Sequence, residues 1–75
     1  MKTQMEIRIW KNSSLIGKTI SEISKIYDVR IIKVSRGELA INPEPKFELK
    51  EADYISYIGD TKNCLNLFDN SVKVQ

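Results

Sequence analysis

The residue types that usually perform catalysis are scarce in this sequence. The chain of 75 residues contains no histidine and one cysteine, Cys64. Ser–His and Cys–His nucleophilic pairs therefore cannot form, and a zinc site, which takes about four nitrogen or sulfur ligands, lacks its donors. A lone thiol also cannot close an intrachain disulfide. The sequence argues against an enzyme, and we expect Cys64 to be a small buried side chain.

One short motif has the composition of a phosphate-binding loop. Gly17-Lys18-Thr19 is similar to the last residues of such a loop, which lead into a helix. The complete motif also needs an earlier glycine, and Asn12 stands at that position. We therefore expect Gly17 to permit a loop conformation and Thr19 to cap a helix.

Three carboxylates, Glu48, Glu51 and Asp53, follow one another at short spacing with Lys46 and Lys50 among them. Paired carboxylates can perform acid–base chemistry or bind Mg²⁺ or Ca²⁺. Here charges of both signs flank a strand in a turn-like segment, which is typical of a solvated surface. We therefore expect neither a catalytic residue nor a metal site.

The charge pattern argues against a nucleic-acid partner. Basic residues number 12 and acidic residues 10, for a net charge of +2, and the two signs alternate along the chain. Nucleic-acid binders usually collect lysine and arginine on one face. A nucleic-acid-binding module is kept as an alternative. Its cationic and stacking side chains would be Arg8, Arg30 and Arg36 with Trp10, Tyr54 and Tyr57, although aromatic residues of strands more often pack in a core.

Hydrophobic periodicity predicts the elements that position these side chains. Met5 to Trp10 alternates apolar with other residues, as in a half-buried strand. An apolar stripe at helical spacing predicts a helix that begins at Thr19 and ends near Tyr27. Thr19 and Glu22 have the spacing of a capping box, in which the hydroxyl and the carboxylate each accept a bond from a backbone N–H.

The segment from Val29 to Arg36 is rich in β-branched residues and predicts a second strand. Regular alternation would place Ile31 on one face, and Ile32 with Val34 on the other. A strand that is apolar on both faces needs cover on both faces. A core of this size rarely contributes more than about 3–5 kcal/mol, so we expect a partner subunit to supply the second cover.

The remaining elements follow from turn residues and further apolar patterns. Glu38–Ile41 predicts a short returning strand, and Asn42–Pro45 interrupts the ladder because proline has no N–H. Tyr54–Ile58 predicts a fourth strand that stops at Gly59. Asp60 can cap a last helix that ends at Phe68. The residues expected on one side of that helix are Thr61, Cys64, Leu65 and Phe68.

These elements predict one α+β domain of order β-α-β-β-β-α over residues 5–70, with flexible termini at residues 1–4 and 71–75. No apolar run reaches the ~18–20 residues of a membrane span, and the first residues do not form a secretory signal. We therefore expect a cytoplasmic protein.

Four further segments carry a pattern when they are taken in order: Ser14–Ile20, Val29–Gly37, Pro43–Leu49 and Asp53–Gly59. Together they resemble the TrkA-C (RCK C-terminal) family of regulators of potassium and cation transport. That family begins its first helix with a Leu-Val-Gly-Lys-Thr-like segment, then has a strand ending in Arg and Gly, a Pro-x-Pro segment, and a Gly-Asp strand closed by Gly. Ala52 stands where the family usually has the glycine before the aspartate.

The resemblance implies a cytoplasmic homodimer that senses a ligand and regulates a cation transporter or a fused or neighbouring domain. Through a transporter partner, the protein would lie at the inner face of the membrane. In some members the dimer cleft binds cyclic di-AMP, and in others an ion, so the implied effector is a cyclic dinucleotide or an ion rather than a cofactor. A nucleotide-binding Gly-x-Gly-x-x-Gly motif is absent from the sequence, so binding of NAD or ATP is not implied. A purely structural dimerisation module without a ligand remains the other alternative.

The predicted ligand site lies where the second strands of two subunits meet. Ile31 and Ile32 would form apolar walls for bases, Arg36 would bind phosphate through two hydrogen bonds, and Asn42 would contact a base edge. The predicted dimer interface consists of Ile31, Ile32 and Val34. Arg36 as a solvated turn residue and Asn42 as a turn former are the competing interpretations.

Overall fold

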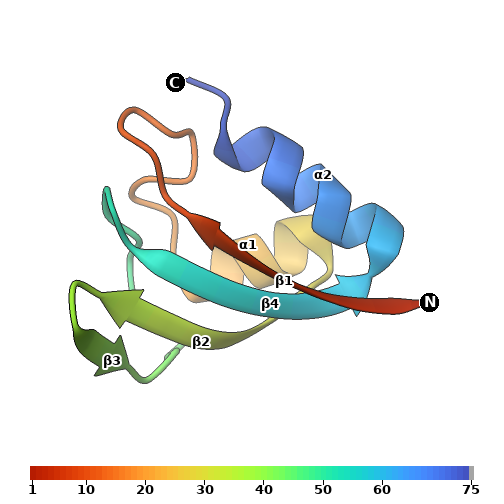
Figure 1. The fold of residues 1–75 in the computed structure, drawn as a ribbon, viewed down its shortest axis with the longest axis horizontal. Coiled ribbons are helices and arrows are strands. Elements are labelled where there is room, and N and C mark those ends of the chain that lie inside the picture. The colour runs from red at the N-terminus through yellow and green to blue at the C-terminus, as the bar shows by residue number, and fades with distance from the viewer. Residues whose placement is uncertain (75) are drawn as a thin grey trace.

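The structure is a computed structural model that describes residues 1–74, so the predicted flexible end at residue 75 lies outside the described residues. Its elements are β1 (Lys2–Arg8), α1 (Ile20–Tyr27), β2 (Arg30–Arg36), β3 (Leu39–Ile41), β4 (Tyr54–Asp60) and α2 (Thr61–Ser71). The chain path in Figure 1 therefore has the predicted β-α-β-β-β-α order and the predicted α+β class.

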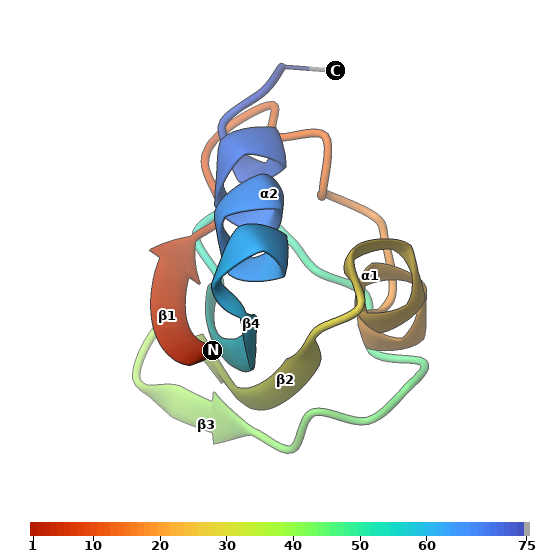
Figure 2. The ribbon, with the colours of Figure 1, turned by 90° about the vertical axis from the view of Figure 1, so that its right-hand side faces the viewer.

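The four strands form one antiparallel sheet in the order β1-β4-β2-β3. Both helices lie on the same face of this sheet: Figure 2 shows α2 above β1 and β4, and α1 beside β2. Side chains alternate between the two faces of a strand, so Met5 and Ile7 of β1 pack toward the helices, whereas Glu6 and Arg8 point to the other face. Among the described residues, no element covers that other face.

The start of α1 confirms the predicted capping box. The Glu22 amide donates to the Thr19 hydroxyl at 3.1 Å, and the Thr19 amide donates to the Glu22 carboxylate at 2.9 Å. The first amides of the helix also have partners, because Ile20 donates to the Phe47 carbonyl and Ser21 to the Pro45 carbonyl. The segment between β3 and β4 is thereby fixed to the helix start.

The hydrophobic core lies between the helices and the sheet. It includes buried side chains from every helix and strand except β3, and four buried side chains from the connecting segments. The buried members are Ile7, Ile9, Leu15, Ile20, Ile23, Val29, Ile31, Val34, Leu49, Ile55, Tyr57, Cys64 and Leu67. Two of these, Ile31 and Val34, are residues that the sequence assigned to opposite faces of a strand.

A β-bulge in β2 explains this error. Ile31 pairs with Tyr57 and Lys33 pairs with Ser56, which are consecutive on β4, so Ile32 is an extra residue in β2. The extra residue shifts the alternation, and Ile31 and Val34 therefore face the same core. The prediction that Val34 shares a face with Ile32 is wrong, and Ile32 is the one residue of the predicted apolar interface that remains exposed, at 38%.

Helix α2 differs from its prediction in length and in its buried side. It continues to Ser71, three residues beyond Phe68, and its Asp60 N-cap makes no side-chain hydrogen bond to the helix. Its buried residues are Cys64, Leu67 and Ser71, whereas Leu65 and Phe68 are exposed. Neither helix in residues 1–74 has the length and apolar character that crossing a membrane requires.

The chain ends within the described residues are held by long-range contacts. Lys2, Thr3 and Gln4 belong to β1 and pair with the end of β4, which runs past Gly59 to Asp60. At the other end, the Ser14 amide donates to the Lys73 carbonyl, and Ser13 and Val74 form an isolated antiparallel bridge. Residues 2–4 and 71–74, predicted as flexible termini, therefore include residues that pair or hydrogen-bond with distant parts of the fold.

Candidate functional site

The predicted site residues lie on the β2–β3 hairpin and the turn after it. Ile31 and Val34 are 6% and 0% exposed, so both lie in the core of the single subunit. Ile32 lies at the bulge and is partly exposed. Ile41, the last residue of β3, pairs with Val34. The following residue, Asn42, therefore lies at the same end of the hairpin as Ile32. Arg36 pairs with Leu39 at the opposite, turn end.

The Arg36 guanidinium is bound to the protein itself. Its Nε donates to Asp53 Oδ1 at 2.8 Å and its Nη2 donates to Asp53 Oδ2 at 2.9 Å, a bidentate arrangement. Nη2 also donates to the Glu48 carbonyl, and the guanidinium lies 4.7 Å from the centre of the Phe47 ring. The hydrogen bonds to Asp53 raise the pKa of Arg36 above its already high ordinary value. The guanidinium of Arg36 was predicted to bind phosphate. Of its three nitrogens, only Nη1 lacks a hydrogen-bond partner within residues 1–74.

Asp53 has a structural role that the sequence did not reveal. Its side chain is fully buried, and besides Arg36 it accepts a hydrogen bond from the Lys50 amide at 2.8 Å. The other two members of the acidic cluster, Glu48 and Glu51, are exposed. Within residues 1–74, no group of three or more cysteine, aspartate or glutamate side chains could hold a metal ion. In the sequence Asp53 follows these two exposed carboxylates at similar spacing, so the pattern gave no signal that Asp53 alone would be buried.

Asn42 is the one predicted site residue with an uncommitted polar side chain. It is exposed, and no hydrogen bond of its side-chain amide is found in residues 1–74. Its carbonyl accepts a bond from the Glu44 amide at 2.8 Å, which forms the turn through Pro43. Asn42 is thus both a turn residue and a free hydrogen-bonding group.

The Gly17-Lys18-Thr19 segment does not form a phosphate cradle. The Gly17 amide donates to the Leu49 carbonyl and the Lys18 amide donates to the Leu15 carbonyl. Gly17 has a φ of 87°, which agrees with its expected role in the loop. The backbone donors that would surround an anion are therefore already in use.

The side chains proposed for nucleic-acid binding are divided between two faces. Arg8 and Arg30 belong to the face of the sheet that lacks helices, whereas Arg36 points to the opposite face and Asp53. Tyr57 is fully buried, and Trp10 and Tyr54 are exposed. The structure therefore does not bring the three arginines together.

Cys64 is buried, as the sequence predicts, and burial raises the pKa of its thiol. Its carbonyl accepts a hydrogen bond from the Tyr57 hydroxyl at 2.9 Å. Burial also raises the pKa of Tyr57 to about 12. Both groups are therefore neutral members of the core rather than reactive side chains.

Solved structures with the same fold include two RCK C domains in complex with c-di-AMP. The RCK_C domain dimer of BusR from S. agalactiae, in complex with c-di-AMP, superposes with a TM-score of 0.78 at 21% identity, covering 91% of this chain and 88% of that one. The RCK C domain of the potassium transport protein KtrA, also in complex with c-di-AMP, gives a TM-score of 0.73 at 26% identity and covers 95% and 84%. At 21% identity, the likeness to BusR concerns the fold alone.

Longer relatives contain the same fold as one part. BusR in complex with its busAB-promoter DNA matches with a TM-score of 0.78 at 21% identity, and this chain covers 35% of that one. The chain therefore spans about a third of the length of that protein. No protein of curated function matches the sequence.

The sequence itself identifies the family. The model of the TrkA-C domain matches residues 5–70, which include every strand and helix of the fold apart from the start of β1 and the last residue of α2. The capped α1, the β2–β3 hairpin and the strand that begins after Asp53 are the segments on which the resemblance rested. The chain belongs to the TrkA-C domain family.

Proposed function

We propose that this chain is a dimeric, non-catalytic regulatory domain that senses a cyclic dinucleotide and controls a potassium or other cation transport system. The observation that carries the proposal is the likeness to the KtrA RCK C domain, which binds c-di-AMP and of which this chain covers 84% at 26% identity. A cytoplasmic location follows from the same proposal. A transporter, or a fused or neighbouring domain, would receive the signal.

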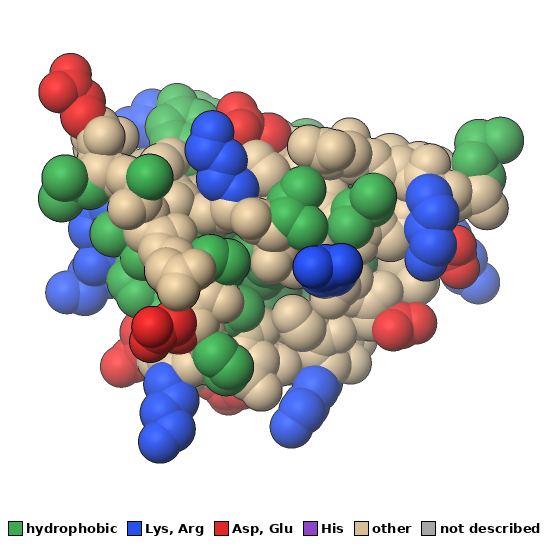
Figure 3. All heavy atoms as spheres, turned by 90° about the horizontal axis from the view of Figure 1, so that it is seen from below, with side chains coloured by type: hydrophobic (Ala, Val, Ile, Leu, Met, Phe, Trp, Pro, Cys, Tyr) green, Lys and Arg blue, Asp and Glu red, His purple; other side chains and the backbone are tan. Residues whose placement is uncertain are grey.

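Exposed apolar groups on the β2–β3 side support a dimer interface there. Ile32 is 38% exposed and Leu39 is 67% exposed. Figure 3 views the molecule from the side on which β2 and β3 lie, and hydrophobic side chains gather in the half of this face that belongs to the β3 end. Because Ile31 and Val34 lie in the core, they would support the interface from beneath, and Ile32 would make the direct contact.

The proposed ligand site uses the groups that the fold leaves available. Ile32 offers an apolar surface for a base, Asn42 offers a side-chain amide for a base edge, and Arg36 offers Nη1 to a phosphate. Ile31 would fix the strand beneath Ile32 and not touch the ligand. A two-fold-symmetric ligand in a two-fold-symmetric cleft repeats each contact in both subunits. Binding would then regulate by favouring the subunit arrangement for which the ligand has the higher affinity.

Calorimetric titration with c-di-AMP tests the ligand. Asn42→Ala should weaken binding about 3- to 10-fold, the value of one neutral hydrogen bond, and leave stability unchanged. Asn66→Ala on exposed α2 is the matched control and should bind as the unaltered protein does. Arg36→Ala is unsuitable because it removes the partner of buried Asp53. If c-di-AMP produces no heat while the protein remains dimeric, the structural dimerisation module replaces the ligand-sensing one.

Sedimentation equilibrium tests the dimer. Ile32→Asp would bury a charge at the proposed interface but leave the single subunit folded, because Ile32 lies outside the core. We expect a monomer with unchanged circular dichroism. A folded monomer of the unaltered protein at micromolar concentration would refute the dimer.

A further inference from the structure

Helix α2 has apolar side chains on two sides, and only one side is used by the core. Cys64 and Leu67 face the sheet, whereas Leu65, Phe68 and Val72 recur at helical spacing and are 49%, 41% and 50% exposed. No element within residues 1–74 covers this second stripe. A helix that is apolar on a second side usually meets another apolar phase there.

The end of this stripe meets the most exposed large aromatic side chain of the chain. The Ser13 hydroxyl donates to the Ser71 carbonyl at 2.6 Å, and the Ser13 amide donates to the Trp10 carbonyl, so the loop after β1 is held against the end of α2. Trp10 is 56% exposed and Val74, which bridges to Ser13, is 73% exposed. These side chains extend the stripe to one end of the molecule.

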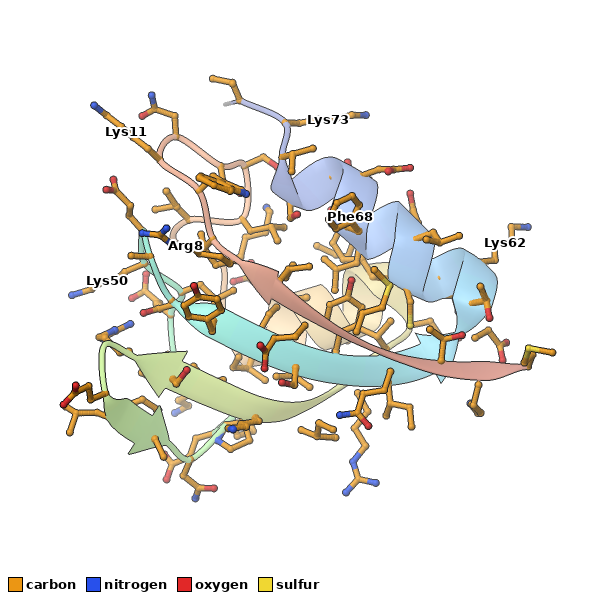
Figure 4. The ribbon with its side chains drawn as sticks, in the orientation of Figure 1. Arg8, Lys11, Lys50, Lys62, Phe68 and Lys73 are labelled. Atoms are coloured by element: carbon orange, nitrogen blue, oxygen red, sulfur yellow. The ribbon has the colours of Figure 1, made fainter. Side chains whose placement is uncertain are left out.

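Cations surround this apolar end. Figure 4 shows Lys11 and Lys73 extending from the upper end of the molecule, with Arg8 below Lys11 and Phe68 on α2. The Arg8 guanidinium lies 5.5 Å from the centre of the Trp10 ring. The ion pairs found within residues 1–74 are Met1–Asp60 and Arg36–Asp53, so none of these three cations has a carboxylate within 4.0 Å. We call this surface the Trp10 patch; it consists of Arg8, Trp10, Lys11, Phe68, Val72, Lys73 and Val74.

We propose that the Trp10 patch binds the surface of a bilayer that contains anionic lipids. Tryptophan prefers the level of the lipid headgroups, the valines and Phe68 can enter the acyl boundary, and the three cations attract anionic headgroups. Asp69, exposed one residue after Phe68, is the carboxylate that opposes this attraction within α2. Exposed valines are of no use to a nucleic acid, which selects stacking and phosphate-binding side chains. The apolar share of the patch therefore favours lipid over nucleic acid.

The proposal is independent of the cyclic dinucleotide site. That site belongs to the β2–β3 hairpin, whereas the Trp10 patch is formed by the end of β1, the loop after it, and the end of α2. A protein that fails to bind c-di-AMP can still bind lipid, and the reverse also holds.

Tryptophan fluorescence tests the proposal directly, because Trp10 is the one tryptophan of the chain. The probe is vesicles of phosphatidylcholine with about 30% phosphatidylserine, compared with vesicles of pure phosphatidylcholine. We expect a blue shift and co-sedimentation with the anionic vesicles only, and a loss of both as ionic strength rises from about 0.05 to 0.5 M. Absence of both signals at low ionic strength would overturn the proposal.

A pair of charge variants localises the binding. Lys11→Gln with Lys73→Gln should lower the vesicle partition coefficient about 30-fold, since each cation near an anionic bilayer contributes about a factor of five. The control, Lys25→Gln with Lys46→Gln, removes the same charge from exposed positions outside the patch and should change it little. Equal partition of the two double variants would refute the assignment.

Two results would assign the patch to another partner and overturn the lipid proposal. A blue shift that depends on protein concentration without vesicles would assign the patch to a second copy of the chain. A blue shift produced equally by duplex DNA would assign the patch to nucleic acid.

Discussion

At the scale of single residues, the clearest result concerns Arg36. The sequence marks it as a phosphate-binding group at a strand end, yet the fold uses two of its nitrogens to neutralise Asp53. The partners are 17 residues apart, and Asp53 stands in a run of surface charges, so no local pattern links them. A candidate site inferred from residue type alone cannot distinguish a free guanidinium from one that is already paired.

Removal of Arg36 should therefore damage the fold before it affects any ligand. Arg36→Ala leaves the buried Asp53 carboxylate without its counter-charge, and breaking such a pair costs about 3–5 kcal/mol. We expect the variant to be largely unfolded in urea titrations that the parent protein survives. Arg30→Ala, at an exposed strand position, is the control and should change stability by less than about 0.5 kcal/mol. Equal stability of the two variants would show that the pair does not hold the fold.

Ala52 offers a second test at this scale. Its φ of 73° lies in the left-handed region, which disfavours alanine by about 1–2 kcal/mol but suits glycine. The turn needs this conformation because the Ala52 amide donates to the Ile9 carbonyl at 2.7 Å while the Asp53 amide donates to the Lys50 carbonyl.

We therefore expect Ala52→Gly to stabilise the protein by about 0.5–1 kcal/mol, measured as a higher thermal midpoint. Ala40→Gly in exposed β3 is the matched control and should be destabilising, because strand alanine has no such strain. A lower midpoint for Ala52→Gly would mean that the turn tolerates alanine without cost.

At the scale of elements, features that depend on neighbouring residues were predicted correctly, whereas features that depend on contacts between distant residues were not. The helix start at Thr19 was predictable because a capping box involves only neighbouring residues. The bulge at Ile32 was not, because it is defined by the pairing of β2 with β4. The prediction of the buried side of α2 was wrong for a related reason. The helix has two apolar stripes, and its packing against the sheet, which the local sequence does not show, determines which stripe is buried.

The capping box makes a prediction about α1. Thr19→Ala should lower stability by about 0.5–2 kcal/mol, the usual cost of losing an N-cap side chain. The backbone hydrogen bond from Thr19 also lowers the pKa of Glu22, so its contribution is present above the ordinary pKa of 4.5 and is lost as pH falls through the lowered value. Thr19→Ala keeps the backbone amide at position 19 that donates to Glu22, so both proteins should lose this contribution in acid. Thermal melts at neutral and acidic pH should therefore show a similar effect of Thr19→Ala. An unchanged neutral-pH midpoint for the variant would refute the role of the cap.

At the scale of the whole molecule, one core connects all parts of a small chain. No buried side-chain nitrogen or oxygen in residues 1–74 lacks a hydrogen-bond partner. The ends belong to this unit as well, since β1 pairs with β4 and the loop after β1 is bonded to the residues that follow α2. The sequence predicted frayed ends because such pairing joins residues almost sixty positions apart. Loss of any central core group should therefore unfold the molecule as a unit.

Titration of Tyr57 at alkaline pH tests whether the molecule unfolds as one cooperative unit. Its pKa is raised by burial from 10 to about 12, so its stabilising contribution is complete below pH 10 and is lost as pH rises through 12. We expect cooperative unfolding in that interval, with tyrosinate absorbance and circular dichroism changing together. Tyr57→Phe should cost about 1 kcal/mol at neutral pH through the lost bond to the Cys64 carbonyl, and should move alkaline unfolding to higher pH. Tyr54→Phe, at an exposed position, should leave the alkaline transition where it is. A gradual change of absorbance without unfolding would contradict the single cooperative unit.

The extra residue of β2 has a consequence for how chain length can vary in this fold. Tyr57 and Ser56 are already consecutive on β4, and they pair with Ile31 and Lys33. Excision of Ile32 would therefore join two residues whose partners are already neighbours, and the register would remain unchanged on both sides. Strand interiors normally reject such an excision because every following side chain would change faces. Here a one-residue gap in the middle of a strand would preserve Val34 in the core and Arg36 beside Asp53, so relatives that lack this residue would be expected to keep the same architecture.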